Sequence, residues 1–311
     1  MAGFHSRTVP SPSALASSLP SGLNTTPATP FRVLVATGDA VDGTVRLWNE
    51  TTLGPVGAPL RTGSGSNGGL SALAFSPDGT LLATSYRDGK VRLWHLAAGR
   101  PAAALQTFFA SAGGVDDVAF SPDGKLLAAS CGDGTVWLWN RATGRLVWRH
   151  HATSNARYGA PDVAFSPHGD LLASADTDGN VRLWNPATGQ SVGAPIPAGT
   201  QAGVVSVAFS PDGKLLASGS DDGTVRLWHP ATGQPAGAPI QAVGALNGVV
   251  AVAFRPDGKL LASGGDDGAV RLWQLSLFAH GYAALCGYVG PPTPQEWNQY
   301  APGERQPSVF G

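Results

Sequence analysis

The chain carries carboxylates and histidines whose types and spacing could support chemistry. Asp221 and Asp222 lie side by side before a glycine, and His229 follows seven residues after Asp222. Two such carboxylates could act as a general acid and a general base, and with the histidine they could form half of a metal site. His150 and His151 are adjacent and could also be metal ligands. Whether these side chains act together depends on the elements that position them.

The turn aspartates belong to a motif that recurs along the chain. "DGTVRLW" stands at 42–48 and 222–228, with the variants "DGKVRLW" at 88–94, "DGTVWLW" at 133–139, "DGNVRLW" at 178–184 and "DGAVRLW" at 267–273. The aspartates are Asp42, Asp88, Asp133, Asp178, Asp222 and Asp267, and the tryptophans are Trp48, Trp94, Trp139, Trp184, Trp228 and Trp273. A second motif, "AFSPDG" or a close variant, precedes every copy except the first. Self-similarity at a period of about 45 residues indicates a repeat architecture.

One period, residues 203–240, predicts four antiparallel strands. "GVVSVAFS" alternates, with Val205, Val207 and Phe209 on one face, and "KLLASGS" is rich in small residues. "TVRLW" alternates again, with Val225 and Leu227 on the face opposite Arg226 and Trp228. "PDG" and "DDG" between them predict tight turns, because proline fixes φ and glycine supplies a positive φ. "PAGAPI" predicts a weak outer strand, since proline cannot donate to a strand ladder and belongs at an edge.

Four-stranded units repeated in this way resemble the blades of WD-repeat β-propellers. The resemblance covers residues 31–275 and implies an all-β propeller of about six blades, the first of them incomplete in sequence. The aspartate that follows the tryptophan in the family is missing here, and so is the family's Gly-His pair. In the family, that histidine joins a buried network with the turn aspartate, a strand hydroxyl and the tryptophan. The hydroxyls are supplied here by Thr37, Thr84, Ser174, Ser218 and Ser263, while Ala129 breaks the series.

The repeat also gives the chemical candidates a structural explanation. An aspartate in each turn accepts hydrogen bonds from that turn, and copies spread around a ring do not converge on one site. "DTDGN" at 176–180 matches the start of a calcium loop, but it lies in register with the other turns. We expect His150 and His151 in an exposed loop. The sequence therefore predicts no catalytic residue, no metal and no cofactor.

The two ends differ from the repeats. Residues 1–30 are rich in Ser, Pro and Thr and are predicted to be a flexible segment. Residues 276–311 carry apolar residues at helical spacing and a helix-start pattern, "TPQEW", which predict a C-terminal extension with short helices. This tail looks like those that follow WD-repeat domains in some large actinobacterial proteins. No inner strand precedes the first motif, so the strand comes from elsewhere in the chain, the first blade is incomplete, or the strand lies upstream in a longer reading frame.

Composition limits the class of protein. The net charge is −1 and 13% of residues are charged, which argues against a nucleic-acid or membrane-surface protein. There is no apolar run of about 20 residues and no secretory signal, so a soluble, cytoplasmic chain is expected. Cys131 and Cys286 are too few for a disulfide framework. Two reduced thiols are expected, with a single bridge as the open alternative.

Residues that differ between repeats are not required by the blade structure, so they are candidates for binding a partner. The turns after the second predicted strand differ, and the loops at 107–114 and 150–160 differ in both length and residues. In a four-stranded meander both sets open on one face, called here the loop face. Tyr and Arg are enriched at binding hot spots. We therefore predict a partner-binding surface formed by Tyr86, Arg87, Arg157, Tyr158, His150, His151, Phe108 and Phe109.

These inferences combine into one functional prediction. The chain is expected to be a non-catalytic scaffold or sensor that binds a protein or peptide partner, as part of a larger bacterial system. It would be monomeric or part of a larger complex, and would bind neither nucleic acid nor membrane. A propeller that binds a sugar or another small ligand is the alternative. An enzyme is the least favoured class, because the predicted inner strands are mostly Val, Ala, Phe and Ser.

Overall fold

The described part of the protein is built from short antiparallel strands without a helix. The computed structural model describes residues 34–38, 44–49, 52, 54–61, 69–97, 100–111, 113–152, 159–199, 203–243 and 248–275. The predicted segments 1–30 and 276–311 lie outside them. No described segment is a helix with the length and apolar character needed to cross a membrane.

The strands form six sheets, each called a blade, in chain order. Blade 1 holds β1 (Leu34–Gly38), β2 (Thr44–Asn49) and β3 (Leu60–Arg61), and blade 2 holds β4 (Leu70–Phe75), β5 (Leu81–Tyr86), β6 (Lys90–Ala97) and β7 (Arg100–Phe109). Blade 3 holds β8 (Val115–Phe120), β9 (Leu126–Cys131), β10 (Thr135–Asn140) and β11 (Leu146–His151), and blade 4 holds β12 (Asp162–Phe165), β13 (Leu172–Ala175), β14 (Asn180–Trp184) and β15 (Ile196–Pro197). Blade 5 holds β16 (Val204–Phe209), β17 (Leu216–Ser220), β18 (Thr224–His229), β19 (Gln234–Pro235) and β20 (Ile240–Gln241), and blade 6 holds β21 (Val249–Phe254), β22 (Leu260–Gly265) and β23 (Val270–Gln274). The predicted all-β architecture of four-stranded propeller blades is confirmed.

The turn between the first two strands shows why "SPDG" recurs. In blade 5 the hydroxyl of Ser210 donates to Asp212 Oδ1 at 2.7 Å and accepts the amide of Leu215 at 2.9 Å. Gly213 has a φ of 71°, which a residue with a side chain rarely adopts. The motif therefore specifies a closed turn that returns the chain antiparallel to the first strand.

In five of the six repeats the closing tryptophan donates a hydrogen bond to the neighbouring strand, as the family network implied. The indole Nε1 donates to the predicted hydroxyl in five blades, in the pairs Trp48–Thr37 (2.8 Å), Trp94–Thr84 (2.9 Å), Trp184–Ser174 (3.1 Å), Trp228–Ser218 (2.9 Å) and Trp273–Ser263 (2.8 Å). In blade 3 the hydroxyl is replaced by Ala129, as predicted. The tryptophan and hydroxyl members of the network are thus present without the family's histidine.

The hydrophobic core lies between blades. Five clusters of buried residues each join two consecutive blades, from the joint of blades 1 and 2 to that of blades 5 and 6. At the last joint, Val225 and Leu227 on β18 pack with Val249 and Val252 on β21. A single blade could not bury these side chains, so stacking stabilises the whole array.

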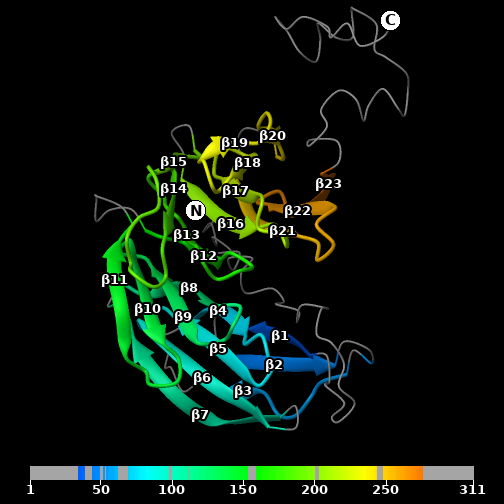
Figure 1. Ribbon diagram of the computed structural model, residues 1–311. Helices are drawn as coiled ribbons and strands as arrows, with labels where there is room; N and C mark the ends of the chain where they lie inside the picture. The colour runs from blue at the N-terminus through cyan, green and yellow to red at the C-terminus, as the bar shows by residue number, and fades with distance from the viewer. Residues whose placement is uncertain are drawn as a thin grey trace, which may run out of the picture.

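The third strand of blade 6, unlike those of the other blades, does not bury its apolar side chains against a following blade among the described residues. Val270 and Leu272 on β23 are 73% and 67% exposed, whereas the equivalent Val225 and Leu227 on β18 are 0% and 5% exposed. Figure 1 shows the blades following one another along an arc, with β7 and β11 at its outer side and β8, β12 and β16 toward its inside. Among the described residues, no hydrophobic cluster joins blade 6 to blade 1.

Candidate functional site

Tyr86, which the sequence places on the partner surface, is a core residue instead. Its side chain is 0% exposed and belongs to the cluster between blades 1 and 2. The guanidinium carbon of Arg92 lies 4.4 Å from its ring centroid. The equivalent residues Cys131, Asp176 and Ser220 are also buried. This position therefore varies because each joint leaves a different interior space, and not because a partner contacts it.

The two phenylalanines at the end of β7 separate into a core residue and a surface residue. Phe108 is 4% exposed, and its ring centroid lies 5.2 Å from that of Trp139 in blade 3. Its predicted place on the partner surface is therefore also corrected. Phe109 is 61% exposed and stays available to a partner. Successive side chains of a strand point to opposite faces, which the prediction of a loop at 107–114 did not take into account.

The remaining predicted residues fall at three places. Arg87 is exposed in the turn between β5 and β6. His150 and His151 are exposed, but they are the last two residues of β11 and not part of a loop as predicted. Arg157 and Tyr158 lie outside the described residues. The structure thus keeps Arg87, Phe109 and the two histidines at the surface.

A salt bridge between the motif's arginine and its turn aspartate recurs in several blades, and the sequence analysis did not predict it. The guanidinium Nη2 contacts the aspartate Oδ2 in four blades: Arg92–Asp88 (3.3 Å), Arg182–Asp178 (3.0 Å), Arg226–Asp222 (3.1 Å) and Arg271–Asp267 (2.6 Å). The constant spacing in "DGTVR" was the available signal. These pairs connect the turn to the middle of the third strand.

Blade 3 lacks this pair because Trp137 stands where the other motifs have arginine. The indole Nε1 of Trp137 donates to Thr135 Oγ1 at 3.0 Å, and its ring is stacked on Trp139 with centroids 5.7 Å apart. The guanidinium carbon of Arg149 on β11 lies 5.0 Å from the Trp137 ring centroid. The replacement of arginine by tryptophan is visible in the sequence as "DGTVWLW", and it distinguishes blade 3 from the other blades.

A cleft of about 480 Å³ opens beside Trp137, between blades 2 and 3. It is lined by Phe109, Ala110, Ser111, Asp133, Thr135, Trp137, Arg149, His150 and His151. Three of the predicted partner residues, Phe109, His150 and His151, thus meet at one place. The cleft combines aromatic, cationic and anionic side chains, which is the composition of a recognition surface.

The carboxylates near the cleft differ in their acidity. Burial would raise the pKa of Asp133, but hydrogen bonds from Ser111 and Thr135 outweigh it and hold the pKa below its ordinary value. Burial raises the pKa of Asp116 to about 6, against the attraction of Arg87 and with added repulsion from Asp133. Asp133 is therefore a permanent negative charge at neutral pH, with a second carboxylate close enough to repel it.

The outer strand of blade 3 is also fixed to blade 4. Trp148 is buried and donates its Nε1 proton to the carbonyl of Pro186 at 2.9 Å. The imidazole of His150 stacks on Trp184 with centroids 5.7 Å apart and planes 4° from parallel. These contacts hold β11 in place, so the exposed Arg149 and His151 are presented on a rigid strand.

The buried carboxyl group of Asp117 and the partly buried one of Asp162 face each other across the first strands of blades 3 and 4. Asp117 accepts the amide of Val163 at 3.2 Å, and Asp162 accepts the amide of Val207 at 2.9 Å. The two side chains hydrogen-bond to each other, and burial followed by mutual repulsion raises the pKa of Asp117 well above its ordinary value. The raised pKa favours a shared proton between the two carboxyl groups, and the pair links the inner strands of three consecutive blades.

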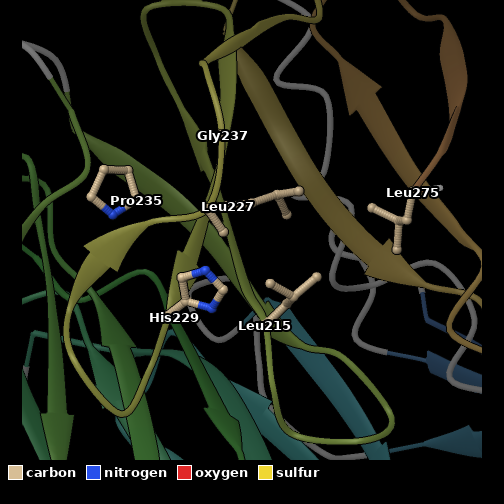
Figure 2. A pocket seen from close by; sticks show the side chains of 7 residues that line it. Leu215, Leu227, His229, Pro235, Gly237 and Leu275 are labelled. Carbon is tan, nitrogen blue, oxygen red and sulfur yellow. The ribbon is translucent and has the colours of Figure 1, made fainter. Parts of the chain in front are cut away.

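The opening candidates Asp221, Asp222 and His229 do not converge. Asp222 lies in the turn before β18 and pairs with Arg226, whereas His229 is the last residue of that strand. His229 lines a hollow of about 300 Å³ with Leu215, Leu227, Pro235, Ala236, Gly237 and Leu275. Figure 2 shows His229 and Pro235 on one side of this hollow and Leu275 on the other. Among the described residues that line the hollow, His229 is the only one with a polar side chain.

The metal candidates likewise remain separate within the described residues. Asp176 and Asp178, from the calcium-like "DTDGN", both pair with Arg182. No group of three His, Cys, Asp or Glu side chains in the described part of the chain could hold a metal ion. Cys131 is a free, buried thiol.

Comparison with known proteins identifies the family. The model described as "WD domain, G-beta repeat" matches residues 57–95, 103–140, 149–185, 195–229 and 239–274. The crystal structure of the computationally designed Ika8 protein is similar, with a TM-score of 0.59 and 26% identity over 80% of this chain and 70% of that chain. No curated protein matches the chain. Because the family model covers more than half of its residues, the chain belongs to the WD-repeat family.

Proposed function

We propose that this chain is a non-catalytic interaction module that binds a peptide segment of a protein partner in the cleft between blades 2 and 3. WD repeats generally serve as protein-interaction modules, which supports the general role. The observation that carries the proposal is the cleft itself. It gathers Phe109, Arg149 and His151 on fixed strands at the one described joint whose arginine is replaced by tryptophan.

The composition of the cleft fits a peptide. Phe109 offers an exposed apolar ring, Arg149 and His151 offer donors, and Asp133 offers an acceptor. Hot spots in protein interfaces are enriched in such aromatic and arginine side chains. We include in the proposal that the module is cytoplasmic, monomeric or a subunit of a larger bacterial complex, and that it binds neither nucleic acid nor membrane.

A capture experiment tests the role. The wild-type chain, the double variant Arg149→Glu/His151→Glu and the control variant Lys214→Glu/Gln234→Glu are immobilised and exposed to a lysate of the source organism. The control makes the same charge change at exposed positions of blade 5. Proteins retained by the wild type and by the control, and lost from the cleft variant, are the expected partners. If all three chains retain the same proteins, the cleft is not the binding surface.

A module that binds a sugar or another small ligand is the second candidate. The cleft volume of about 480 Å³ falls within the range of ligand pockets, and Trp137 and Phe109 could stack on a sugar ring. Thermal unfolding in the presence of a glycan and metabolite panel separates the two functions. A ligand that raises Tm of the wild type, and not of Trp137→Ala, would favour this alternative.

A further inference from the structure

The arginine of the blade 5 motif, Arg226, lies between blades 4 and 5. In blade 5, Arg226 Nη2 contacts Asp222 Oδ2 at 3.1 Å, and its Nη1 donates to the carbonyl of Ala198 at 2.5 Å. Ala198 follows the outer strand of blade 4, so the guanidinium bridges the end of one blade and the turn of the next. The acceptors are a carboxylate and a carbonyl, which suit the planar fork of a guanidinium.

In blade 3 no arginine stands at this position of the motif, and the guanidinium of Arg149 on β11 lies over the Trp137 ring at 5.0 Å from its centroid. Trp137 replaces the arginine, and its indole is held against Thr135 and Trp139. Asp133 is the equivalent of Asp222, and Ala110 is the equivalent of Ala198; both line the cleft. The acceptor set that binds Arg226 in blade 5 is thus repeated in blade 3, beside an open volume.

We propose that the cleft between blades 2 and 3 receives the guanidinium group of an arginine side chain from the protein partner, in the place that corresponds to Arg226 in blade 5. The inference rests on the proposed function and names the partner residue that the cleft selects. Asp133 Oδ2 would be its main acceptor. That oxygen now accepts the hydroxyl of Ser111 at 2.5 Å, and a hydroxyl brings no opposite charge.

The walls of the cleft support a cation with an apolar stem. Phe109 is 61% exposed, so its ring can cover the methylene groups of an arginine or stack on the guanidinium plane. Asp116 and Asp133 repel each other, and a cation beside Asp133 relieves that repulsion. An acidic side chain in the same place would add a third negative charge.

Arg149 and His151 are the cationic groups that face the same cleft, and they act against a second cation. Both are exposed, so water and salt screen their repulsion, whereas Asp133 is partly buried. Arg149 is stacked over Trp137 at the outer wall, and can also pair with a carboxylate next to the arginine in the partner.

The test uses small probes of known chemistry. N-acetyl-arginine N-methylamide, its citrulline counterpart and its glutamate counterpart are titrated into the full chain. Binding is followed by the indole N–H resonance of Trp137, assigned with Trp137→Phe. The arginine compound should bind at least about tenfold more tightly than citrulline, which has the same shape without the charge. The glutamate compound should be the weakest.

Variants locate the binding. Asp133→Asn retains an acceptor for the turn but loses the charge, and should weaken arginine binding about tenfold. Trp137→Arg places the chain's own guanidinium in the cleft and should abolish binding. Because this variant lacks the Trp137 indole, its binding is monitored through the amide resonance of Thr135. Asp222→Asn is the matched control, because Asp222 already pairs with Arg226, and should leave binding unchanged.

The outcomes distinguish this inference from the proposed function. If arginine shifts no cleft resonance, if citrulline binds equally, or if Trp137→Arg binds like the wild type, the guanidinium assignment is wrong. If Trp137→Arg does not fold, the arginine affinity of Asp133→Asn tests the assignment, and an affinity equal to that of the wild type contradicts it. A capture experiment that still depends on Arg149 and His151 would then leave the peptide-binding role intact with a different partner residue.

Discussion

The indole nitrogen of Trp228 on β18 donates a 2.9 Å hydrogen bond to the hydroxyl of Ser218 on β17. Both side chains are buried, so the donor has no access to water. Ser218→Ala removes the acceptor and should lower the free energy of unfolding by about 1–3 kcal/mol. Urea unfolding measures the change. Ser191→Ala, at an exposed position of blade 4, is the control and should change stability by less than about 0.5 kcal/mol. An equal effect of both variants would contradict a role for the hydrogen bond.

The pair of Asp222 and Arg226 predicts an acid-dependent part of the stability. Burial alone would raise the pKa of Asp222, but Thr224 and Arg226 outweigh it and hold the pKa at about 2. A carboxyl whose pKa is lower in the folded state stabilises the fold above its unfolded pKa of about 4, and the contribution is lost as the pH falls toward about 2. Asp222→Asn should therefore cost about 1 kcal/mol at neutral pH and almost nothing at about pH 2. Unfolding at the two pH values measures the difference, and a cost that does not change with pH would refute the prediction.

The buried pair of Asp117 and Asp162 predicts the opposite pH dependence. The pKa of Asp117 is raised by burial and by Asp162. A carboxyl whose pKa is raised on folding contributes stability that is present in acid and lost as the pH rises through its folded pKa. Asp117→Asn resembles the protonated acid, so the variant should lose less stability than the wild type as the pH rises above the unfolded pKa of about 4.

A second variant at this position serves as the control. Asp117→Leu leaves the amide of Val163 without its acceptor and should cost about 1–3 kcal/mol at every pH. Chemical unfolding at several pH values separates the two variants. If Asp117→Asn follows the pH dependence of the wild type, the carboxyl pair does not hold the proton.

Cys131 should be unreactive while the chain is folded. Its thiol is 0% exposed, and burial raises its pKa to about 12 against a hydrogen bond with Thr135. Because the thiolate is the reactive form, alkylation in a Cys286→Ser background should be slow in buffer and complete in denaturant. Mass spectrometry after timed quenching measures the modified fraction. Fast modification without denaturant would show that the joint between blades 2 and 3 opens readily.

The regular part of the fold could be predicted because each signal was local and repeated. The "SPDG" turn is specified by Ser210, Asp212 and Gly213 within a few residues. The partner of Trp228 could be predicted from its register, since Ser218 lies at a constant distance along the motif. Because the same signal recurs in every repeat, the first three strands of a blade could be predicted, whereas the ends of the outer strands β7 and β11 were expected in loops.

The candidate site could be predicted only in part, because variation between repeats has two causes. Phe109, His150 and His151 vary and are exposed, whereas Tyr86 varies and is buried. A sequence does not show how far apart two blades lie, and that distance decides whether a variable residue fills a joint or faces solvent. Trp137 carried the clearest signal, since it replaces a constant arginine, but its meaning required the Arg226–Asp222 geometry for comparison.

Val270 and Leu272 on β23 show how such an array can change its length. Every joint uses the same two surfaces, the third strand of one blade and the first strand of the next, as with Val225 and Val249. One repeat carries both surfaces, so a duplicated repeat meets a matching neighbour on each side without any change in its core residues. A copied repeat would therefore lengthen the array without disturbing the existing joints, and each joint could carry its own variation, such as Trp137 between blades 2 and 3.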